Sequence, residues 1–449
     1  MSELMDYLKA AKSPYHVCDY AEKRLEAAGF DKLEITDGFE LAPGGRYYCR
    51  PYPTVLFAFK TGEKITGGGM HIACAHTDSP TFRIKPSPEM GQRGGIKRVN
   101  VEPYGGSLKR TWFDRPLGVA GEVILKSGDP FAPKAVLFDS EQPWFIIPSL
   151  APHMDREIEE KKLDVQKELI PVYGIEKDNE CDDSAPGDIN KGVDDIRHDY
   201  VNTITGAIAN KLGIDEGEIL DYDLSLYLYE EPVLCGVDSE FLLSSRIDNV
   251  ASVAALTEGL IGNASNGVNA HGDNDISVIA LFDNEEIGSR SKQGADSSVL
   301  NLLIDRIFES GLFKDISKTG AIASSSMLSV DGAHGVHPNY PEKADETARV
   351  LLGKGLVLKS SAAQRYVTDP YMGAVVAGIC EENGIAFQRQ ANRSGAPGGQ
   401  TLGPLVSSYL PIPAADLGVP MLAMHSAKET MCPSDYDALL HLSEIWLRV

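Results

Sequence analysis

The sequence is poor in basic residues: 42 Lys and Arg stand against 65 Asp and Glu, which gives a formal net charge of −23. Because a nucleic-acid interface needs clustered positive charge, nucleic acid is not an expected partner. The seven cysteines are scattered and form no CxxC pair, so neither a disulfide framework nor a thiolate zinc site is indicated. No run of about 20 apolar residues occurs, so no membrane partner is expected either.

The N-terminal segment MSELMDYLKAAKSP carries acidic residues and lacks the apolar stretch of an export signal. We therefore expect a cytoplasmic protein. The composition, 43% hydrophobic and 24% charged, is typical of a globular protein, and the length allows two or three domain-sized cores.

The pattern of apolar residues divides the chain into three parts. Residues 1–89 and 233–449 alternate between helical and strand periods, which predicts an α/β fold with a mixed central sheet flanked by helices. Residues 90–232 contain Gly-rich turns, β-rich runs and the acidic stretch 176–188, and we interpret them as an inserted β-rich domain with a long surface loop. The outer parts are predicted to form helices at 14–28, 247–261, 300–308, 372–382 and 436–447, and strands within 46–60, 70–75, 276–282, 325–330, 386–389 and 421–424.

Four of the predicted strands end directly in carboxylate or imidazole side chains. Because ligands of open α/β sheets bind beyond the carboxyl ends of the strands, these side chains could share one crevice. A His and carboxylate set without thiolates suits zinc, manganese or cobalt, and a shared carboxylate can hold two ions ~3.5–4 Å apart. The set comprises His76 and Asp78, then Asp283, Glu285 and Glu286, then Asp331, His334 and His337, then His425, with Asp248 at the start of a predicted helix.

Each of these residues also has an ordinary structural interpretation. Glu285 and Glu286 could be solvated surface acids, although a nearby cation would offset their mutual repulsion. His76 could be a hydrogen-bonded core histidine, Asp248 a helix cap, and His425 simply a buried side chain. Their joint occurrence at strand ends is what favours a metal site.

Six short motifs occur along the chain: HTDSP at 76–80, WFDR at 112–115, SRIDN at 245–249, FDNEEIGS at 282–289, DGAHGVHPNY at 331–340 and MHS at 424–426. In this order they resemble the aspartyl aminopeptidase family of dinuclear metallopeptidases, and the likeness extends from about residue 13 to the C-terminus. The resemblance implies a zinc-aminopeptidase-like catalytic domain whose inserted domain dimerises. It also implies that the homodimers build a tetrahedral dodecamer.

The resemblance implies a metal ligand at five matching positions. His76 and Asp331 would bind one divalent ion, and Glu286 and His425 would bind a second. Asp248 would bridge the two ions. The ions would be zinc, with manganese or cobalt as alternatives.

The resemblance also implies how the reaction would proceed. Glu285 would be the general base for a metal-bridged water that attacks the first peptide carbonyl, and it would return the proton to the departing amine. Asp78 would hold the ring of His76, as metal-ligating histidines commonly require. The Asp248–Asn249 peptide bond would be cis.

The family favours peptides with a free N-terminal Asp or Glu. Lys359 matches a basic residue that meets the acidic side chain, or it is a solvent-facing lysine. Tyr366, seven residues further on, is expected to bind substrate as well. His153 matches a histidine that reaches a neighbouring subunit's site, or it is a loop histidine. His334 would contact the substrate, or it hydrogen-bonds within its own turn. Because the net charge repels acidic peptides at long range, an acidic preference requires a local positive pocket.

We therefore expect a metallo-aminopeptidase that trims acidic N-terminal residues from peptides. One alternative is a broader aminopeptidase or an amidohydrolase that uses the same dinuclear site. Another is a noncatalytic assembly protein that metal ions stabilise.

Overall fold

The computed structural model describes residues 1–448 except 159, 176–202, 264–275 and 397. The chain forms two compact units, the first comprising Met1–Thr81, Tyr104–Thr111 and Glu230–Val449, the second Phe82–Pro103 and Trp112–Tyr229. The inserted domain was expected at 90–232. The second unit begins at Phe82 and ends at Tyr229, and the segment Tyr104–Thr111 between its two parts belongs to the first unit. The expected loop at 176–188 lies outside the described residues. Within the described ranges, no helix combines the length and apolar character that crossing a bilayer needs.

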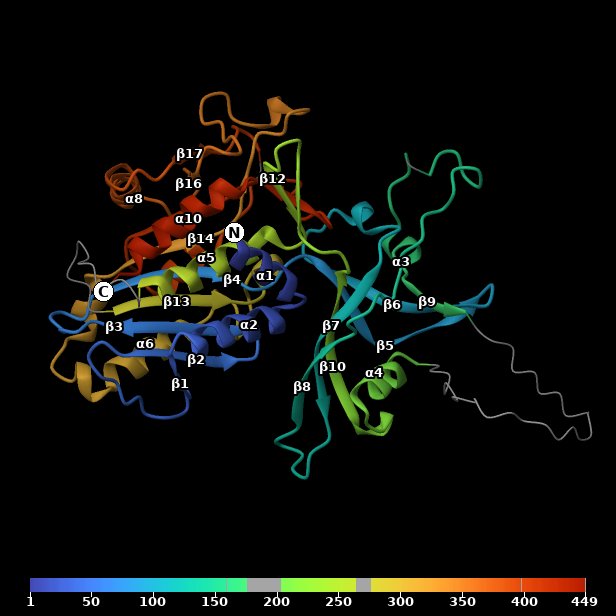
Figure 1. Cartoon of the computed structure of the whole chain (residues 1–449), viewed down its shortest axis with the longest axis horizontal. Coiled ribbons are helices and arrows are strands. Elements are labelled where there is room, and N and C mark those ends of the chain that lie inside the picture. The colour runs from blue at the N-terminus through green and yellow to red at the C-terminus, as the bar shows by residue number, and fades with distance from the viewer. Residues whose placement is uncertain (159, 176–202, 264–275, 397, 449) are drawn as a thin grey trace, which may run out of the picture. The chain divides into compact units, whose positions relative to one another are not determined.

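A nine-stranded mixed sheet forms the centre of the first unit (Figure 1), with strand order β1-β2-β3-β13-β4-β14-β18-β16-β17. Strand β4 pairs in parallel with β13 on one side and with β14 on the other. Three carboxyl ends therefore lie next to each other, and the expected mixed α/β sheet is confirmed. The strands are β1 (Asp31–Leu33), β2 (Arg46–Tyr52), β3 (Val55–Thr61), β4 (Met70–His76), β13 (Ile276–Phe282), β14 (Ser326–Val330), β16 (Leu356–Ser360), β17 (Phe387–Ala391) and β18 (Ala414–Gly418).

Apolar clusters cover both faces of this sheet. Ala73 and Ala75 of β4 join one cluster, while Ile72 and Cys74 join the other, as the two-residue period of a strand requires. The first cluster includes α1, α2, α5, α8 and α10, and the second includes α6 and α9. The helices are α1 (Ser2–Ala10), α2 (Pro14–Ala27), α5 (Ile247–Asn263), α6 (Val299–Glu309), α7 (Lys318–Ala323), α8 (Pro370–Glu382), α9 (Leu402–Tyr409) and α10 (Pro433–Trp446).

A smaller five-stranded sheet also belongs to the first unit, with strand order β11-β12-β20-β19-β15. The predicted strand at 421–424 lies in this sheet and ends at Leu422, because Ala423 and His425 adopt positive φ angles of 55° and 68°. His425 therefore comes from a turn between two strands of the smaller sheet. The strands are β11 (Val233–Cys235), β12 (Phe241–Ser244), β15 (Ala333–His334), β19 (Pro420–Leu422) and β20 (Glu429–Met431).

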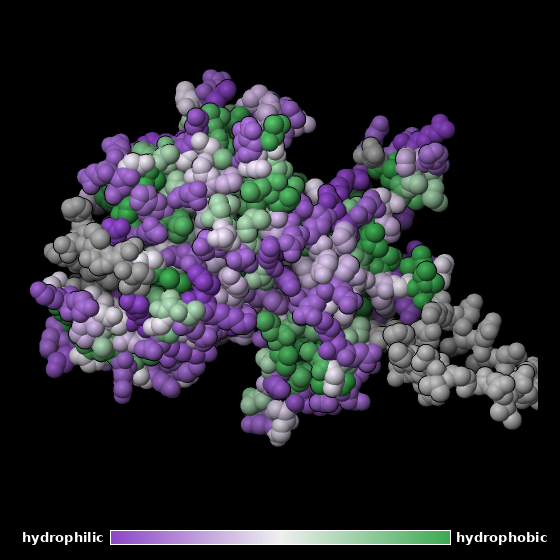
Figure 2. All heavy atoms as spheres, viewed as in Figure 1, coloured by the Kyte–Doolittle hydropathy of each residue, from purple (hydrophilic) through white to green (hydrophobic). Residues whose placement is uncertain are grey.

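The second unit is built on a six-stranded sheet with strand order β8-β7-β10-β5-β6-β9. Phe82 and Trp112 pack edge to face in its core, with ring centroids 5.0 Å apart. Figure 2 shows apolar residues gathered over α4, β8 and β10, where Leu137 and Leu220 are exposed. The elements are β5 (Thr81–Arg93), β6 (Ile96–Tyr104), β7 (Leu117–Leu125), β8 (Lys134–Asp139), α3 (Val165–Glu168), β9 (Val172–Ile175), α4 (Ile204–Leu212) and β10 (Ile219–Leu228).

Candidate metal centre

His76 and Asp331 meet beyond the ends of neighbouring parallel strands. His76 ends β4 opposite Phe282, the last residue of β13. Asp331 follows β14, and its N–H donates to the carbonyl of Leu417 in β18 at 2.9 Å. A Cβ on Gly418 would stand 1.7 Å from the Asp331 carbonyl oxygen, so only glycine permits this approach. As a result, His76 Nε2 lies 3.5 Å from Asp331 Oδ1.

Asp248 is held at the start of α5 through its backbone. Its N–H donates to Oε2 of Glu429 at 3.0 Å, and its carbonyl accepts the hydroxyl of Ser79 at 2.8 Å. The side chain of Asn249 donates to the carbonyl of Val330 at 2.8 Å, which ties this helix to the end of β14. The Asp248–Asn249 peptide bond is cis, as expected. These contacts direct a buried carboxylate towards the strand ends.

Glu285 and Glu286 begin the 3₁₀ turn Glu285–Ile287 that follows β13. Their backbone N–H groups donate to Oδ1 and Oδ2 of Asp78, each at 3.1 Å. The hydroxyl of Tyr104 donates to the same carboxylate at 2.7 Å. Asp78 is fully buried and therefore fixes the position of the turn.

Two groups of ligand atoms share Asp248. Its Oδ1 lies 3.5 Å from His76 Nε2, and its Oδ2 lies 3.4 Å from His425 Nε2. The same nitrogen of His425 lies 3.3 Å from Oε2 of Glu286. Two atoms that each bind a tetrahedral Zn²⁺ at ~2.0–2.1 Å are ~3.3–3.4 Å apart, so the spacing fits ligands of common ions. One group is His76, Asp248 and Asp331, and the other is Asp248, Glu286 and His425.

Two buried oxygens of this site lack a hydrogen bond. Oδ1 of Asp248 and Oε1 of Glu286 accept none from the part of the chain that the structure describes. Buried polar atoms are normally satisfied, so both atoms are available to a cation.

The electrostatics of the site also favour a cation. Burial and the charge of Asp248 raise the pKa of Glu286 well above its usual range, and burial raises the pKa of Glu285 to about 8. Burial opposes the protonation of His76, but the nearby carboxylates of Asp248, Asp331 and Asp78 outweigh burial and raise its pKa. Negative charge is thus concentrated out of contact with water, and bound divalent metal would offset it. The donor set therefore fits divalent metal ions.

The remaining expected site residues have different surroundings. Asp78 was expected to hold the His76 ring. Nδ1 of His76 lies 3.1 Å from the backbone carbonyl oxygen of Asp78 and 3.4 Å from the carboxylate Oδ1 of Asp78. The carbonyl is therefore the closer acceptor, while the carboxylate holds the turn at Glu285. Glu285 also lies near metal ligands, because its carboxylate comes within 4.8 Å of atoms of His76 and Glu286. His153 is an exposed residue of the second unit.

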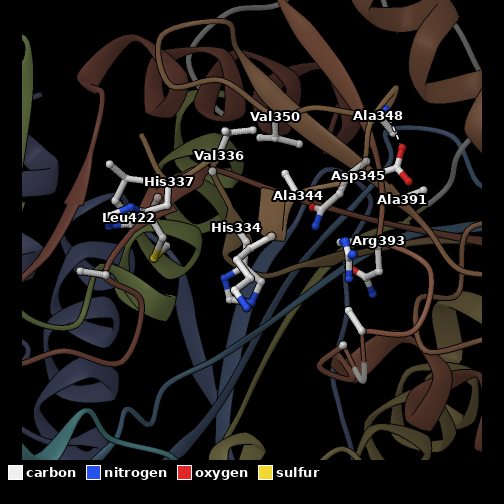
Figure 3. Close-up of a pocket in the computed structure, with 18 residues that line it drawn as sticks. His334, Val336, His337, Ala344, Asp345, Ala348, Val350, Ala391, Arg393 and Leu422 are labelled. Carbon is white, nitrogen blue, oxygen red and sulfur yellow. Dashed lines mark hydrogen bonds between the residues drawn. The ribbon is translucent and has the colours of Figure 1, made fainter. Parts of the chain in front are cut away.

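A cavity of about 370 Å³ opens beside His334 (Figure 3), and Met421 and Leu422 of β19 form part of its wall. In this view His334 lies centrally, with His337 and Leu422 on one side and Arg393 and Asp345 on the other. His334 is exposed, but protein atoms surround its ring. The resulting desolvation and the charge of Lys359 lower the pKa of His334. The polar side chains of the wall are His334, His337, Lys343, Asp345, Gln390, Asn392 and Arg393.

Lys359 and Tyr366 are not among the described residues that line this cavity. Both are buried, with 2% and 4% of their surface exposed. The ammonium group of Lys359 donates to the carbonyl of Gly332 at 2.6 Å and lies 5.4 Å from the centroid of the Tyr366 ring. Asn392, in the cavity wall, donates to the Tyr366 hydroxyl at 3.5 Å. The alternative of a solvent-facing lysine therefore does not hold.

Three residues that support the site had no role in the expectations from sequence. Tyr104 belongs to none of the six motifs, and Ser79 stands in one of them without a role of its own. Glu429 follows His425 by four residues, a spacing that could have drawn attention to it. The roles of all three depend on contacts between distant segments, which no local pattern reveals.

Comparison with known proteins identifies relatives over nearly the whole chain. The family model "Aminopeptidase I zinc metalloprotease (M18)" matches residues 7–444. A "Probable M18 family aminopeptidase 2" of Clostridium novyi is 38% identical over 439 residues, covering 97% of this chain and 95% of that protein. A protein of the same name from Clostridium acetobutylicum is 37% identical over 431 residues, covering 95% of this chain and 93% of that protein.

Solved structures share the fold. The crystal structure of prApe1 is 27% identical, covers 99% of this chain and 93% of its own, and superposes with a TM-score of 0.88. The Chaetomium thermophilum mApe1 structure is 28% identical, with 99% and 96% coverage and a TM-score of 0.83. The S. cerevesiae mApe1 dodecamer, 24% identical with 99% and 95% coverage and a TM-score of 0.79, shows likeness of fold alone.

Proposed function

Since the chain belongs to the M18 family of aminopeptidases, which are zinc metalloproteases, we propose that it removes acidic N-terminal residues from peptides at a centre holding two divalent ions. The observation that carries the proposal is the position of Asp248, whose two oxygens lie 3.5 Å from His76 and 3.4 Å from His425. A carboxylate in this position can bind two ions at once. Membership of an enzyme family excludes the noncatalytic alternative.

The proposed ligands divide between the two ions. His76 and Asp331 would hold one ion, Glu286 and His425 would hold the other, and Asp248 would contact both. Zinc is the metal named for the family. When bound, such ions acidify a water molecule and polarise the scissile carbonyl.

Glu285 is proposed as the general base. Its backbone is fixed by Asp78, so the side chain is positioned without being committed to a hydrogen bond of the turn. Glu285 would take a proton from the attacking water and deliver it to the departing amine. Burial raises its pKa to about 8, which suits a group that accepts and returns a proton near neutral pH. Bound cations would move this pKa down again, because they offset the neighbouring carboxylates.

The acidic preference is proposed from the positive groups around the cavity. Lys343 and Arg393 stand in its wall, and the charge of buried Lys359 acts on His334. These cations would attract a carboxylate locally in spite of the net charge of −23. Peptides with a free N-terminus are therefore the proposed substrates.

Self-association is proposed through the second unit. Phe131, Met154 and Ile175 are 98%, 76% and 78% exposed there, which is unusual for large apolar side chains. The S. cerevesiae neighbour is a dodecamer, and we propose homodimers that build the same assembly. In such an assembly His153 would be available to a neighbouring subunit. Six cysteines of the described residues are free, which fits the proposed cytoplasmic location.

An amide panel with metal depletion tests the proposal. The purified protein should release Asp and Glu from N-terminal amides faster than Leu or Arg, lose activity in a chelator, and regain it when Zn²⁺ is added. If an amide with a neutral or basic N-terminal residue is cleaved fastest, the acidic preference is wrong and the protein is a broader aminopeptidase. Metal-independent turnover, or none on any amide, would refute the proposed function.

Lys359→Met tests the acidic preference separately, with Lys343→Met as a matched lysine in the cavity wall. Because Lys359 does not line the cavity, its buried charge would act on a bound carboxylate without touching it, so kcat/KM for the Asp amide relative to the Leu amide should fall about tenfold in Lys359→Met. We expect a smaller change in Lys343→Met, because that side chain is exposed. An unchanged ratio in Lys359→Met would remove this residue from substrate recognition.

A further inference from the structure

Glu429 is a buried acid that the roles above leave unused. It is the first residue of β20, pairs with Ser244 of β12, and is 1% exposed. Its Oε1 accepts the backbone N–H of His425 at 2.7 Å, and its Oε2 accepts the backbone N–H of Asp248 at 3.0 Å. One side chain thus connects two proposed ligands that are far apart in the sequence.

Neither of these ligands sits in regular backbone structure. Asp248 has φ −78° and ψ 107°, which is non-helical although it lies within the bounds of α5. His425 has φ 68°, a left-handed conformation that is uncommon for a residue other than glycine. Regular hydrogen-bonding ladders therefore do not hold the two backbones, and Glu429 holds both of them directly.

We propose that Glu429 is a positioning residue that sets the separation of Asp248 and His425 and thereby the affinity of the Asp248, Glu286 and His425 group for a metal ion. The inference rests on the proposed two-ion site. The group of His76, Asp248 and Asp331 depends less on Glu429, because strand pairing holds His76 and Asp331. The effect of Glu429 is therefore selective for one ion.

Glu429→Gln removes half of this connection. An amide has one acceptor oxygen, and its NH₂ group faces the second backbone N–H instead of accepting from it. Asp435→Asn is a matched control: Asp435 is also buried, and it accepts two backbone N–H groups, those of Gly353 and Gly355, at 2.8 and 2.7 Å. The control loses an equivalent hydrogen bond outside the candidate metal groups.

The measurement is titration of the metal-free proteins with Zn²⁺ alone, by calorimetry and by competition with a chromophoric chelator. Wild type should bind two ions. In Glu429→Gln, one Kd should rise about 10–100-fold, as for other residues that orient metal ligands, while the second changes less than threefold. Both Kd values should stay within threefold in Asp435→Asn. Circular dichroism and thermal unfolding of the metal-free proteins check that each variant is folded.

A double substitution identifies the affected group. His425→Ala should weaken the same site, and adding Glu429→Gln to it should weaken that site by less than threefold further, because the two residues act together. Glu429→Asp retains both oxygens on a side chain one methylene shorter, which does not reach both amides, so it should reproduce the selective loss.

The possible failures are distinguishable. If wild type does not bind two ions, the proposed function fails. If wild type binds two ions but Glu429→Gln leaves both Kd values unchanged or weakens both equally, the positioning role is overturned. Failure of both Glu429 variants to fold would assign the residue to the fold and would overturn the role as well.

Discussion

Replacing Glu285 by Gln separates two roles that the geometry allows for this side chain. Its carboxylate lies within 4.8 Å of ligand atoms of His76 and Glu286, so it could bind an ion as well as act as a base. Gln keeps the shape of the side chain and leaves the backbone bond to Asp78 intact. It cannot take up a proton from water at neutral pH, which removes the basic function alone.

The two roles predict different magnitudes. General acid–base catalysis contributes about 10²–10⁴-fold, so loss of the base should lower kcat by this factor, equivalent to about 3–5 kcal/mol in the activation barrier. Metal content should then remain at the wild-type level. If Glu285 is instead a ligand, Gln binds metal more weakly, and the affinity for Zn²⁺ should fall together with kcat.

The assay combines steady-state turnover of an Asp amide with metal analysis of the same sample. Glu258→Gln is a suitable control, because Glu258 is only 11% exposed, accepts hydrogen bonds from Arg24, and lies outside the candidate metal groups. We expect the control to retain kcat within a few fold. Unchanged turnover in Glu285→Gln would refute the base assignment, and loss of bound metal would reassign the residue as a ligand.

Two further predictions concern the shared ligand and the core. Asp248→Asn replaces two charged oxygens by one neutral oxygen, which cannot contact two ions. Metal analysis should therefore find at least one ion fewer per chain, and equal metal content would contradict the bridging role. In β3, burial lowers the pKa of Lys60 to about 8 from 10.5, so its charge destabilises the fold most below pH 8, and this cost disappears as the pH rises above about 10.4. Lys60→Met should therefore raise the free energy of unfolding by up to about 3 kcal/mol at pH 7, and denaturant unfolding at pH 7 and 10.5 should show this gain shrinking. A constant difference at both pH values would contradict the assignment to Lys60.

The elements that the sequence predicts well are those with strong periodicity. Strands β4 and β13 are nearly continuous apolar runs, because parallel strands in the middle of a sheet are covered on both faces. Helices α2, α5, α6, α8 and α10 follow the helical period and form where expected. Helix α9 and strand β18 were not predicted from the sequence. The helix begins Leu-Gly-Pro, and a Cβ on its Gly403 would lie 2.6 Å from Val367, so packing requires a residue that weakens the helical pattern. Strand β18 carries a fully buried Asp416, which hides its apolar character.

The composition of the candidate site was more predictable than its construction. Residue types at strand ends pointed to His76, Asp331 and the Glu285–Glu286 pair, and the resemblance supplied individual roles. The sequence did not show that β19 belongs to a second sheet, since a three-residue strand has the same pattern in either sheet. It also could not show that Asp78 reaches Glu285 or that Glu429 reaches Asp248, because pairings across the fold leave no local period.

The candidate centre is assembled between two sheets of the first unit. His76 and Asp331 extend from the nine-stranded sheet, whereas His425 and Glu429 belong to the five-stranded sheet or its turn. Bringing these carboxylates and imidazoles together adds repulsion and desolvation, so it does not stabilise a metal-free fold. The apolar clusters on both faces of the large sheet must offset that cost. Asp248 lies between the two sets of ligands, so in the proposed two-ion centre it is the residue that would contact an ion held from either sheet.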